Sequence, residues 1–567
     1  MQAAAGIVPP EVLAPPDAHS RGFDRDDTAL VLDGWLRRLT GQEGRCRLVL
    51  GRLAHAFLGR HGQHVLGVAR LGDYARDRLG LSAREVQTLA WVAQRLAGLP
   101  AVRAAFAAGE VSWAQLRLLV GVATPGTEVE WLARARGRTV RALAAVIRAT
   151  GSLPADEDGA EASDPSVRFR LRCPRRVARR WGVAVELARR MAGAQLSQGQ
   201  AAEAIAAEGL AAQPCSAAPW PSAWRAAEPP PDPDETHDAF AADLDWTAVA
   251  EAIPQEVEHL VLGVEDLDAF ALDERMRAAV CALQRIDWQT GRLLRLFLDR
   301  RLYRPMLFSS AARYLRERLG MSERKARALV ALERKTWQAP GLGEAYRVGQ
   351  LSWVRALTLL PIVSATTAGA WVERARAVTV RRLADEVAWA LAVRRPCAPI
   401  LPPPLGAVLV EPARQMCARE AWEPVDAEIR FSAPASVVGL LRTAIVAFTG
   451  PPDALWRGFE KLLDHVIAEW EAQPRHRDPI FARDGWRCAV PACSSRRNLH
   501  DHHLLFRSRG GGNTRDNRIT VCAWHHLCGI HGGRVRAWGT APDAITWELG
   551  VRPGREPLLR LEGERYV

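Results

Sequence analysis

Apolar positions in the first 470 residues follow a helical period. They recur at three- and four-residue intervals after two capping signals, Ser82 with Glu85 and Ser112 with Gln115. A glycine precedes each signal, where a preceding helix is expected to end. Such spacing is typical of the buried face of amphipathic helices. The pattern therefore predicts a helical region whose apolar residues form a core.

A repeat with a constant offset indicates that one helical unit is used twice. The segment YARDRLGLS at 74–82 matches YLRERLGMS at 314–322, so Tyr314 lies 240 positions after Tyr74. GEVSW and GQLSW, ending at Trp113 and Trp353, keep the same offset. Short β-prone runs at 167–171 and 428–431, each followed by a proline and helical sequence, extend the correspondence. The repeat predicts two copies of one domain.

Cysteines and histidines cluster after the helical region. Cys488 and Cys493 form one knuckle, and Cys522 and His525 form a second. Four sulfur and imidazole ligands in two short knuckles suit a tetrahedral zinc site. Four protein ligands leave no open coordination position, so this zinc is expected to stabilise a small domain.

The histidines outside this zinc site fall on a predicted β-hairpin and helix. Residues 499–506 and 518–521 read as strands joined by a loop with glycines at 510–512, and a short helix follows from near Cys522. Neighbouring strand residues point to opposite faces, which separates His502 from His503. Consecutive helix residues diverge by about 100°, so His526 can turn away from the zinc toward the hairpin.

These histidines predict a second metal site. His502 and His526 are its expected ligands, and His531 is a candidate third ligand. The five-residue spacing from His526 makes His531 the weakest member, because four residues keep two side chains on one helix face. Asp501 is an alternative to His502. Imidazoles with open water positions suit a catalytic Mg2+, Mn2+ or Zn2+ ion acting on a phosphate oxygen.

Two further residues complete the predicted chemistry. His503, as a neutral histidine outside both metal sites, is the expected general base. Asn517 has an amide that can fix the loop and so the orientation of that base.

This ordered set resembles the HNH nuclease motif of the ββα-metal type. The resemblance implies that His502 holds metal, His503 is the general base and Asn517 orients it. The two knuckles resemble the zinc-containing HNH subgroup. The helical copies resemble a domain of unknown function that precedes HNH modules in many bacterial proteins, which implies no activity for them. The expected function is metal-dependent hydrolysis of phosphodiester bonds in DNA, and the rival is a non-catalytic zinc-containing nucleic-acid-binding protein.

Positive charge is concentrated in the same segment. The whole chain carries a formal charge of +12, and residues 475–540 contain 12 Arg, 4 Asp and no Glu, a net +8. A basic surface of this kind suits a DNA partner. The expected phosphate contacts are Arg507, Arg509, Arg515 and Arg518.

The helical copies are expected to act as a scaffold or as a homodimer surface. The alternative is that RLGLS at 78–82 forms the turn of a DNA-reading helix-turn-helix. The chain has no apolar run near 18 residues, and its six cysteines outside the motif and Cys528 show no disulfide framework. These features predict a cytoplasmic, nucleoid-associated protein with no membrane partner.

The expected fold is mainly α, with a duplicated helical region and a small C-terminal zinc-stapled ββα-metal (HNH) domain. The predicted order is a disordered N-terminus at 1–25, helical copy 1 at 26–210, a Pro-rich acidic linker at 211–250, helical copy 2 at 251–474, the HNH domain at 475–550 with its trailing hairpin, and a tail at 551–567.

Overall fold

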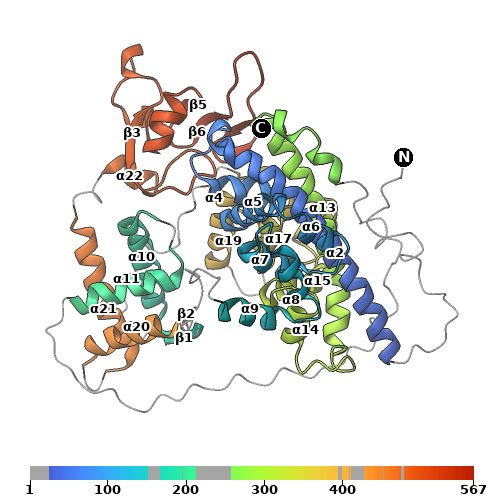
Figure 1. Ribbon diagram of the computed structural model, residues 1–567. Helices are drawn as coiled ribbons and strands as arrows, with labels where there is room; N and C mark the ends of the chain where they lie inside the picture. Colours follow the sequence, from blue (N-terminus) through green and yellow to red (C-terminus); the bar gives the residue numbers. More distant parts are fainter. Residues whose placement is uncertain are drawn as a thin grey trace.

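The chain is mainly helical, with a small sheet region near its C-terminal end (Figure 1). A computed structural model describes residues 25–150, 166–194, 196–211, 257–393, 399–405, 427–450, 453–473 and 478–567, with the single residues 407, 409 and 425. The predicted disordered N-terminus and the predicted linker lie outside the described residues, apart from residues 25 and 211.

The long helix and the last five helices of copy 1 have counterparts in the same order in copy 2. Copy 1 consists of α2 (Arg25–Gly59), α3 (Gly62–Val65), α4 (Leu71–Tyr74), the π turn η1 (Ala75–Leu79), α5 (Ala83–Ala97), α6 (Pro100–Ala107), α7 (Trp113–Val122), α8 (Glu128–Ala135) and α9 (Val140–Ala149). Copy 2 consists of η2 (Glu258–Val261), η3 (Val264–Asp266), α13 (Ala269–Asp299), α14 (Ala311–Glu317), α15 (Glu323–Gln338), α16 (Pro340–Arg347), α17 (Trp353–Leu359), α18 (Ala368–Ala377) and α19 (Val380–Val393).

The predicted capping signals form as expected. The Ser82 hydroxyl accepts a hydrogen bond from the Glu85 backbone N–H, and Ser112 with Gln115 forms a complete capping box. Each cap satisfies backbone N–H groups that have no partner within the helix. Gly80 and Gly109 adopt positive φ angles of 68° and 76° at the preceding turns. The local sequence therefore sets where α5 and α7 begin.

Reciprocal contacts join the two copies about an approximate two-fold relation. The Tyr74 hydroxyl donates to Asp273 (2.9 Å), and Tyr314, its counterpart, donates to Asp33 (3.0 Å). Each buried aspartate also pairs with an arginine of the opposite copy. α2 and α13 pack along each other, and their buried residues share one core with α5 and α15. The copies therefore share one hydrophobic core at their junction, and each copy also has a further core made of its own residues.

The second half of each copy forms a smaller lobe with the corresponding half of the other. Its elements are β1 (Ser166–Cys173), α10 (Arg175–Ala192), α11 (Gln198–Ala211), β2 (Ala427–Pro434), α20 (Ala435–Ala447) and α21 (Leu455–Glu471). β1 and β2 pair antiparallel, with Phe169 opposite Phe431. The strands predicted at 167–171 and 428–431 are confirmed. Their cross-copy pairing explains the small lobe that lies beside the long helices and below the C-terminal part in Figure 1.

The Leu-Gly-Leu-Ser turn lies at the junction between the copies. A Cβ on Gly80 would approach the Ser352 side chain to 2.7 Å, and Gly320 meets Ser112 in the same way. Leu79 is 1% exposed. A turn packed against the opposite copy favours the scaffold interpretation over a DNA-reading helix-turn-helix, whose turn and second helix must reach a groove.

The C-terminal part contains a hairpin, a helical turn and a four-stranded sheet. Its elements are α22 (Pro479–Arg483), β3 (Leu499–His503), the 3-10 turns η5 (Arg507–Arg509) and η6 (Arg515–Asn517), β4 (Arg518–Cys522), the π turn η7 (His525–Ile530), β5 (Val535–Thr540), β6 (Ala544–Leu549), β7 (Leu559–Glu562) and β8 (Arg565–Tyr566). β3 and β4 pair antiparallel, as predicted, and so do β5 and β6.

The predicted tail at 551–567 is corrected by this sheet. β7 pairs with β6 and β8 pairs with β7, so the last residues complete the sheet. Leu561 is 1% exposed and belongs to the same core as Cys488 and Trp547. Each of these strands is too short to be recognised from the sequence. They form because pairing with an existing sheet edge supplies their hydrogen bonds.

Candidate metal centre

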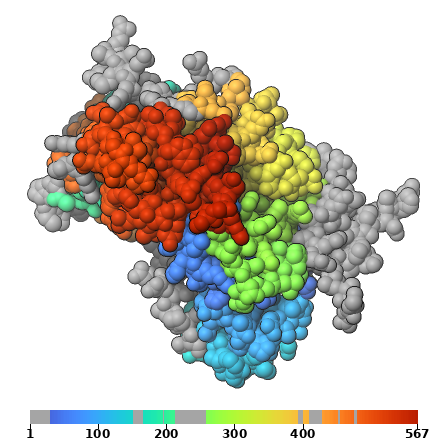
Figure 2. Space-filling model, turned by 90° about the horizontal axis from the view of Figure 1, so that it is seen from above, coloured from blue at the N-terminus to red at the C-terminus, as the bar shows by residue number. Residues whose placement is uncertain are grey.

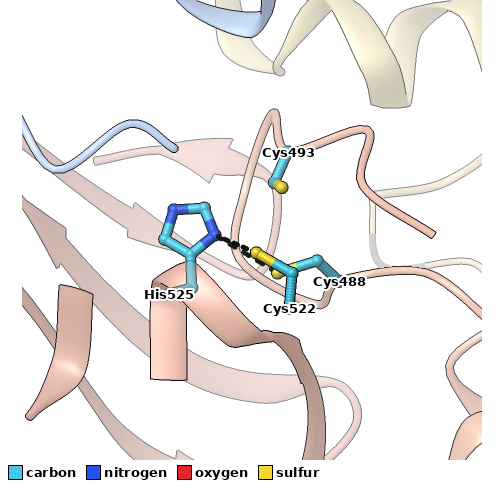
Figure 3. Close-up of side chains that lie close together, drawn as sticks. All are labelled: Cys488, Cys493, Cys522 and His525. Carbon is cyan, nitrogen blue, oxygen red and sulfur yellow. Dashed lines mark hydrogen bonds between the residues drawn. The ribbon is translucent and has the colours of Figure 1, made fainter. Parts of the chain in front are cut away.

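Three cysteines and a histidine converge at the junction of the hairpin, the knuckle and η7. The ligand atoms of Cys488, Cys493, Cys522 and His525 all lie within 4.8 Å of one another, and all four residues are buried (Figure 3). His525 Nδ1 lies 3.4 Å from the Cys488 sulfur and 3.3 Å from the Cys522 sulfur. Figure 3 shows the imidazole edge turned toward these sulfurs. This set could hold one metal ion.

The chemistry of the four donors fits a cation such as Zn2+. Burial lowers the pKa of His525, but the Cys488 and Cys522 sulfurs outweigh it and raise that pKa to about 10. Contacts from Cys488 and Cys493 lower the pKa of the Cys522 thiol, which favours the thiolate that a metal binds. The sulfurs therefore attract positive charge at this point. Sulfur and imidazole donors in a closed buried set are those that structural zinc prefers.

The helical body supplies the partner of the other His525 nitrogen. His525 Nε2 lies 3.3 Å from the carbonyl oxygen of Gly67, in the turn after α3. A carbonyl can only accept, so Nε2 carries a hydrogen, and Nδ1 is the nitrogen that faces the cysteines and from which a bound metal ion would displace the proton. Gly67 has a φ of 75°, and a Cβ there would approach the Gly550 N and Arg534 O atoms to 2.9 and 3.0 Å. This close approach brings the carbonyl to the imidazole.

Two charged side chains of the helical body hold the cysteine knuckle itself. Arg381 of α19 donates to the carbonyl oxygen of Cys488 (2.8 Å) and to that of Cys493. Asp73 of α4 accepts from the backbone N–H (3.1 Å) and the hydroxyl of Ser494. Burial lowers the pKa of Arg381 to about 10, so its guanidinium stays charged near neutral pH. Both copies therefore contribute to the surroundings of the four ligands, which Figure 2 shows as the C-terminal part seated on both.

We expect Arg381→Met to weaken metal retention at the four-ligand cluster. The change keeps the length of the buried side chain and removes the donors to the Cys488 and Cys493 carbonyls. Loss of an outer partner of a metal ligand lowers affinity by roughly 10- to 100-fold. The measurement is the zinc that remains bound after titration with a chelator, with circular dichroism as a check on folding.

The neighbouring Arg382→Met is the matched control for this change. Arg382 is also half-buried, but it pairs with Glu386 and donates to Ala407, away from the knuckle. It should leave zinc retention unchanged. Equal retention in Arg381→Met and Arg382→Met would contradict a role for Arg381 in holding the knuckle.

A second cluster contains His502, His526 and His531. Their ligand atoms lie within 4.8 Å of one another, and exposure rises from the buried His502 through His526 to the exposed His531. The ring centroids are 5.0 Å apart for His502 and His526 and 5.5 Å for His502 and His531. The three imidazoles thus converge with one side toward solvent. Such a set could hold a metal ion with open positions for water or substrate.

A π turn explains how a five-residue spacing brings His526 and His531 together. η7 has the i→i+5 pattern, and the His531 N–H donates to the His526 carbonyl at 3.1 Å. The wider turn places residues five apart on one face, and π turns occur often at functional sites. Their ring centroids are 5.0 Å apart. The argument that a five-residue spacing disfavours His531 as a ligand holds only for a regular α-helix. The π turn brings this residue into the cluster.

Strand alternation separates the histidines of β3 as predicted. His502 joins the cluster, whereas Asp501 lies on the other side of the strand and pairs with Arg518. Burial first, and then the neighbouring imidazoles, lowers the pKa of His502 to about 4. The ring is therefore neutral near pH 7, in the form that binds metal. Asp501 does not belong to the cluster, so it does not replace His502.

His503 lies half-buried, and its side-chain partner is a residue that the sequence did not indicate. His503 Nε2 lies 2.8 Å from Oδ1 of Asn513 in the glycine-rich loop. Asn517 instead accepts from the Leu505 N–H (2.7 Å) and donates to the Gly512 carbonyl (2.8 Å). Asn517 thus fixes the loop, as predicted, while Asn513 contacts the imidazole directly. The sequence contains Asn513 four residues before Asn517, and loop geometry decides which of them reaches His503.

The four arginines predicted to contact phosphate differ in their surroundings. Arg507, Arg509 and Arg515 are exposed in and after the loop, and the Arg509 guanidinium lies 5.5 Å from the Phe506 ring centroid. Arg518 pairs with the Asp501 carboxylate, which neutralises its charge locally. The Phe506 ring in turn packs against His502 and His531, so Arg509 lies near the histidine cluster, and Arg507 and Arg515 are exposed in the same segment.

His500 is a further histidine that contacts the second cluster, through His526. His500 Nδ1 lies 2.8 Å from His526 Nδ1, so one ring nitrogen must donate and the other accept. Two residues separate His500 and His502 on β3, so both lie on one face of the strand. The spacing of two residues between His500 and His502 on a predicted strand could have indicated that His500 lies near the cluster. No comparable pattern in the sequence indicates the contacts of Gly67, Asp73 and Arg381 with the C-terminal part.

Comparisons with protein-family models, curated proteins and solved structures found no match for this chain. Within the described part of the chain, no helix combines the length and apolar character needed to cross a membrane.

Proposed function

We propose that the C-terminal part is an HNH-type endonuclease domain that hydrolyses phosphodiester bonds in DNA. The observation that carries this proposal is the convergence of His502, His526 and His531 beside His503, on an antiparallel hairpin followed by a helical turn. A domain that only binds nucleic acid needs the four-ligand cluster for stability and does not need a second, half-open histidine cluster. This order of elements resembles the ββα-metal arrangement of HNH nucleases.

The histidine cluster has the donors for a catalytic divalent ion. Bound there, such an ion would supply Lewis-acid stabilisation of negative charge on a phosphodiester oxygen. His502 would hold it from the buried side, and His526 and His531 from the half-open side. The separate cysteine cluster would hold a structural Zn2+ that stabilises the core of the domain.

His503 has the chemistry of a general base in this arrangement. Asn513 Oδ1 can only accept, so His503 Nε2 carries the hydrogen in their 2.8 Å contact, and Nδ1 keeps its lone pair. Nδ1 can then accept a proton from the water that attacks phosphorus. Asn517 holds the loop that carries Asn513 through Leu505 and Gly512. This chain of contacts would keep the imidazole in one tautomer.

The exposed arginines of the loop would position the substrate. Guanidinium groups match phosphate oxygens in geometry and charge, and Arg507, Arg509 and Arg515 are exposed between β3 and β4. Arg518 is a weaker candidate because Asp501 already occupies it. The proposal therefore assigns DNA-backbone contact mainly to the first three.

A nicking assay on supercoiled plasmid separates the nuclease from its rival. We expect conversion of supercoiled to relaxed or linear DNA with Mg2+ or Mn2+, and none with EDTA, because the chemical step needs the ion at the histidine cluster. The rival, a non-catalytic zinc-containing nucleic-acid-binding protein, predicts binding without conversion under every condition. Zinc-replete protein that binds plasmid and leaves it supercoiled with each ion would support that rival.

A further inference from the structure

An open groove lies between the two helical copies, outside the C-terminal part. It has a volume of about 1110 Å³ and is lined by the middle of α2, by residues around the start of α7, and by the end of α14 with the following turn. Small-molecule pockets usually enclose about 300–1,000 Å³. The groove is therefore at least as large as a complete small-molecule site. We define it as the basic groove by five of its six exposed arginines, Arg37, Arg38, Arg117, Arg138 and Arg316; the sixth, Arg318, pairs with Asp33.

Positive charge dominates the lining. Nine of the lining residues are Arg or Lys, and three are Glu. Two of the acids are engaged: Glu43 pairs with Arg47 and Lys325, and Glu110 pairs with Arg136. The five arginines that define the groove come from α2, α7, α14 and the turn after α8. Arginines spread over separate segments suit an extended polyanion better than a single phosphate group.

The duplication provides an internal comparison for these arginines. The positions 240 residues after Arg38, Arg117 and Arg138 are Ala278, Leu357 and Val378. The same fold is thus built in the other copy without positive charge at these three positions. Helix packing does not require arginine at these three positions, so their charge needs another explanation; Arg37 and Arg316 have arginine counterparts, Arg277 and Arg76.

The corresponding face of the other copy is covered by the C-terminal strands. Val378, 2% exposed, forms an antiparallel bridge with Arg565, and the Thr379 N–H donates to the Glu564 carbonyl at 3.0 Å. Tyr566 of β8 donates to Asp77, which lies in the turn before Gly80. Of two related faces, one therefore carries the C-terminal part of the chain, and the other is open and lined with arginine.

We propose that the basic groove binds the phosphate backbone of duplex DNA, apart from the site of cleavage. The choice of DNA rests on the proposed function, because the substrate of the C-terminal domain is the polyanion that this chain would meet. Charge complementarity supports it, since exposed arginines that replace condensed counterions bind DNA with little dependence on sequence. The groove would hold DNA to the helical body and raise the local concentration of substrate for the histidine cluster.

The test compares two double variants of the full-length protein. Arg37→Ala with Arg316→Ala removes two exposed guanidinium groups from the groove. Arg277→Ala with Arg285→Ala is the matched control, because both are exposed helical arginines outside the groove and Arg277 is the counterpart of Arg37. Binding of a labelled duplex of a few helical turns is measured by fluorescence anisotropy over a salt series with EDTA. Each lost phosphate contact should reduce the slope of log K against log salt by about 0.9, or about 1.8 for the groove variant.

The expected result is weaker binding and a smaller salt slope for the groove variant, with the control equal to the parent. Hydrolysis of bis(p-nitrophenyl) phosphate, which is too small to span the groove, should be equal in all three proteins. Parent-like DNA affinity and slope in the groove variant would overturn the proposal. So would a groove variant that loses binding of polyglutamate while keeping that of DNA, because the partner would then be an acidic protein.

The same experiment separates this proposal from the proposed function. If no protein cleaves plasmid or bis(p-nitrophenyl) phosphate, but the groove variant still binds DNA with a reduced slope, the groove assignment is supported and the nuclease assignment fails. Cleavage by all three proteins with equal DNA binding would support the nuclease and overturn the groove.

Discussion

His503→Ala is expected to reduce plasmid cleavage by at least about 100-fold while zinc content and DNA binding stay near those of the parent. General acid–base catalysis contributes about 10²- to 10⁴-fold, and the change removes the proposed proton acceptor without touching either ligand cluster. The measurements are the nicking rate with Mg2+ or Mn2+, the zinc content, and duplex binding with EDTA.

Chemical rescue distinguishes a base from a structural residue at this position. Added imidazole should restore part of the activity of His503→Ala, because a small base can occupy the space that the side chain leaves. Added imidazole should not restore the activity of His526→Ala in the same way, because that variant lacks a ligand of the histidine cluster. An unchanged cleavage rate in His503→Ala would reject the assignment, and loss of activity with no rescue and a lost zinc would indicate a structural role.

Cys493→Ser is expected to lose one bound zinc per chain and to unfold the core of the C-terminal part. Apparent binding energies of structural zinc sites are about 10–16 kcal/mol, and that energy is part of the folding energy. Cys493 is 1% exposed in the core that also contains Val521 and Trp547, so losing the metal there exposes buried surface. Elemental analysis gives the zinc content, and hydrogen exchange of β3 to β6 reports whether the strands remain protected.

Two companion variants define what this result means. Cys528→Ser changes an exposed thiol of the same segment that lies outside both clusters, and it should retain zinc and activity. His526→Ala should retain the zinc of the cysteine cluster and lose cleavage, because it removes a ligand of the other site. If His526→Ala lost the cysteine-bound zinc, or if Cys493→Ser kept it, the division of the histidines between the two sites would be wrong.

Features that depend on neighbours along the chain could be predicted from the sequence. The Ser82 and Ser112 caps, the β3–β4 hairpin and the opposite directions of His502 and His503 all follow from hydrogen bonding and side-chain periodicity within a few residues. Two short spacings also predict the grouping of Cys488, Cys493, Cys522 and His525, and the ligand atoms of these residues lie close together in the structure. The repeat could be recognised from similar segments at a constant offset of 240 residues.

Local geometry that departs from the regular pattern could not be predicted in the same way. A regular helix turns His526 and His531 apart, and only the π turn of η7 brings them together. Asn513 rather than Asn517 reaches His503 because the glycine-rich loop folds back over the hairpin. The final strands are too short to be recognised until the edge with which they pair exists.

The sequence alone determined which residues can hold metal and that a helical unit occurs twice. Both features can be recognised from short motifs and the spacing of their residues. Only the tertiary structure decided what surrounds those residues. Gly67, Asp73 and Arg381 lie far from Cys493 in sequence, and packing of both copies brings them to the knuckle. The basic groove likewise has no signal along the chain, because its arginines belong to separate segments that lie far apart in the sequence. Contacts between distant segments depend on how whole faces pack, and local periodicity carries no information about that packing.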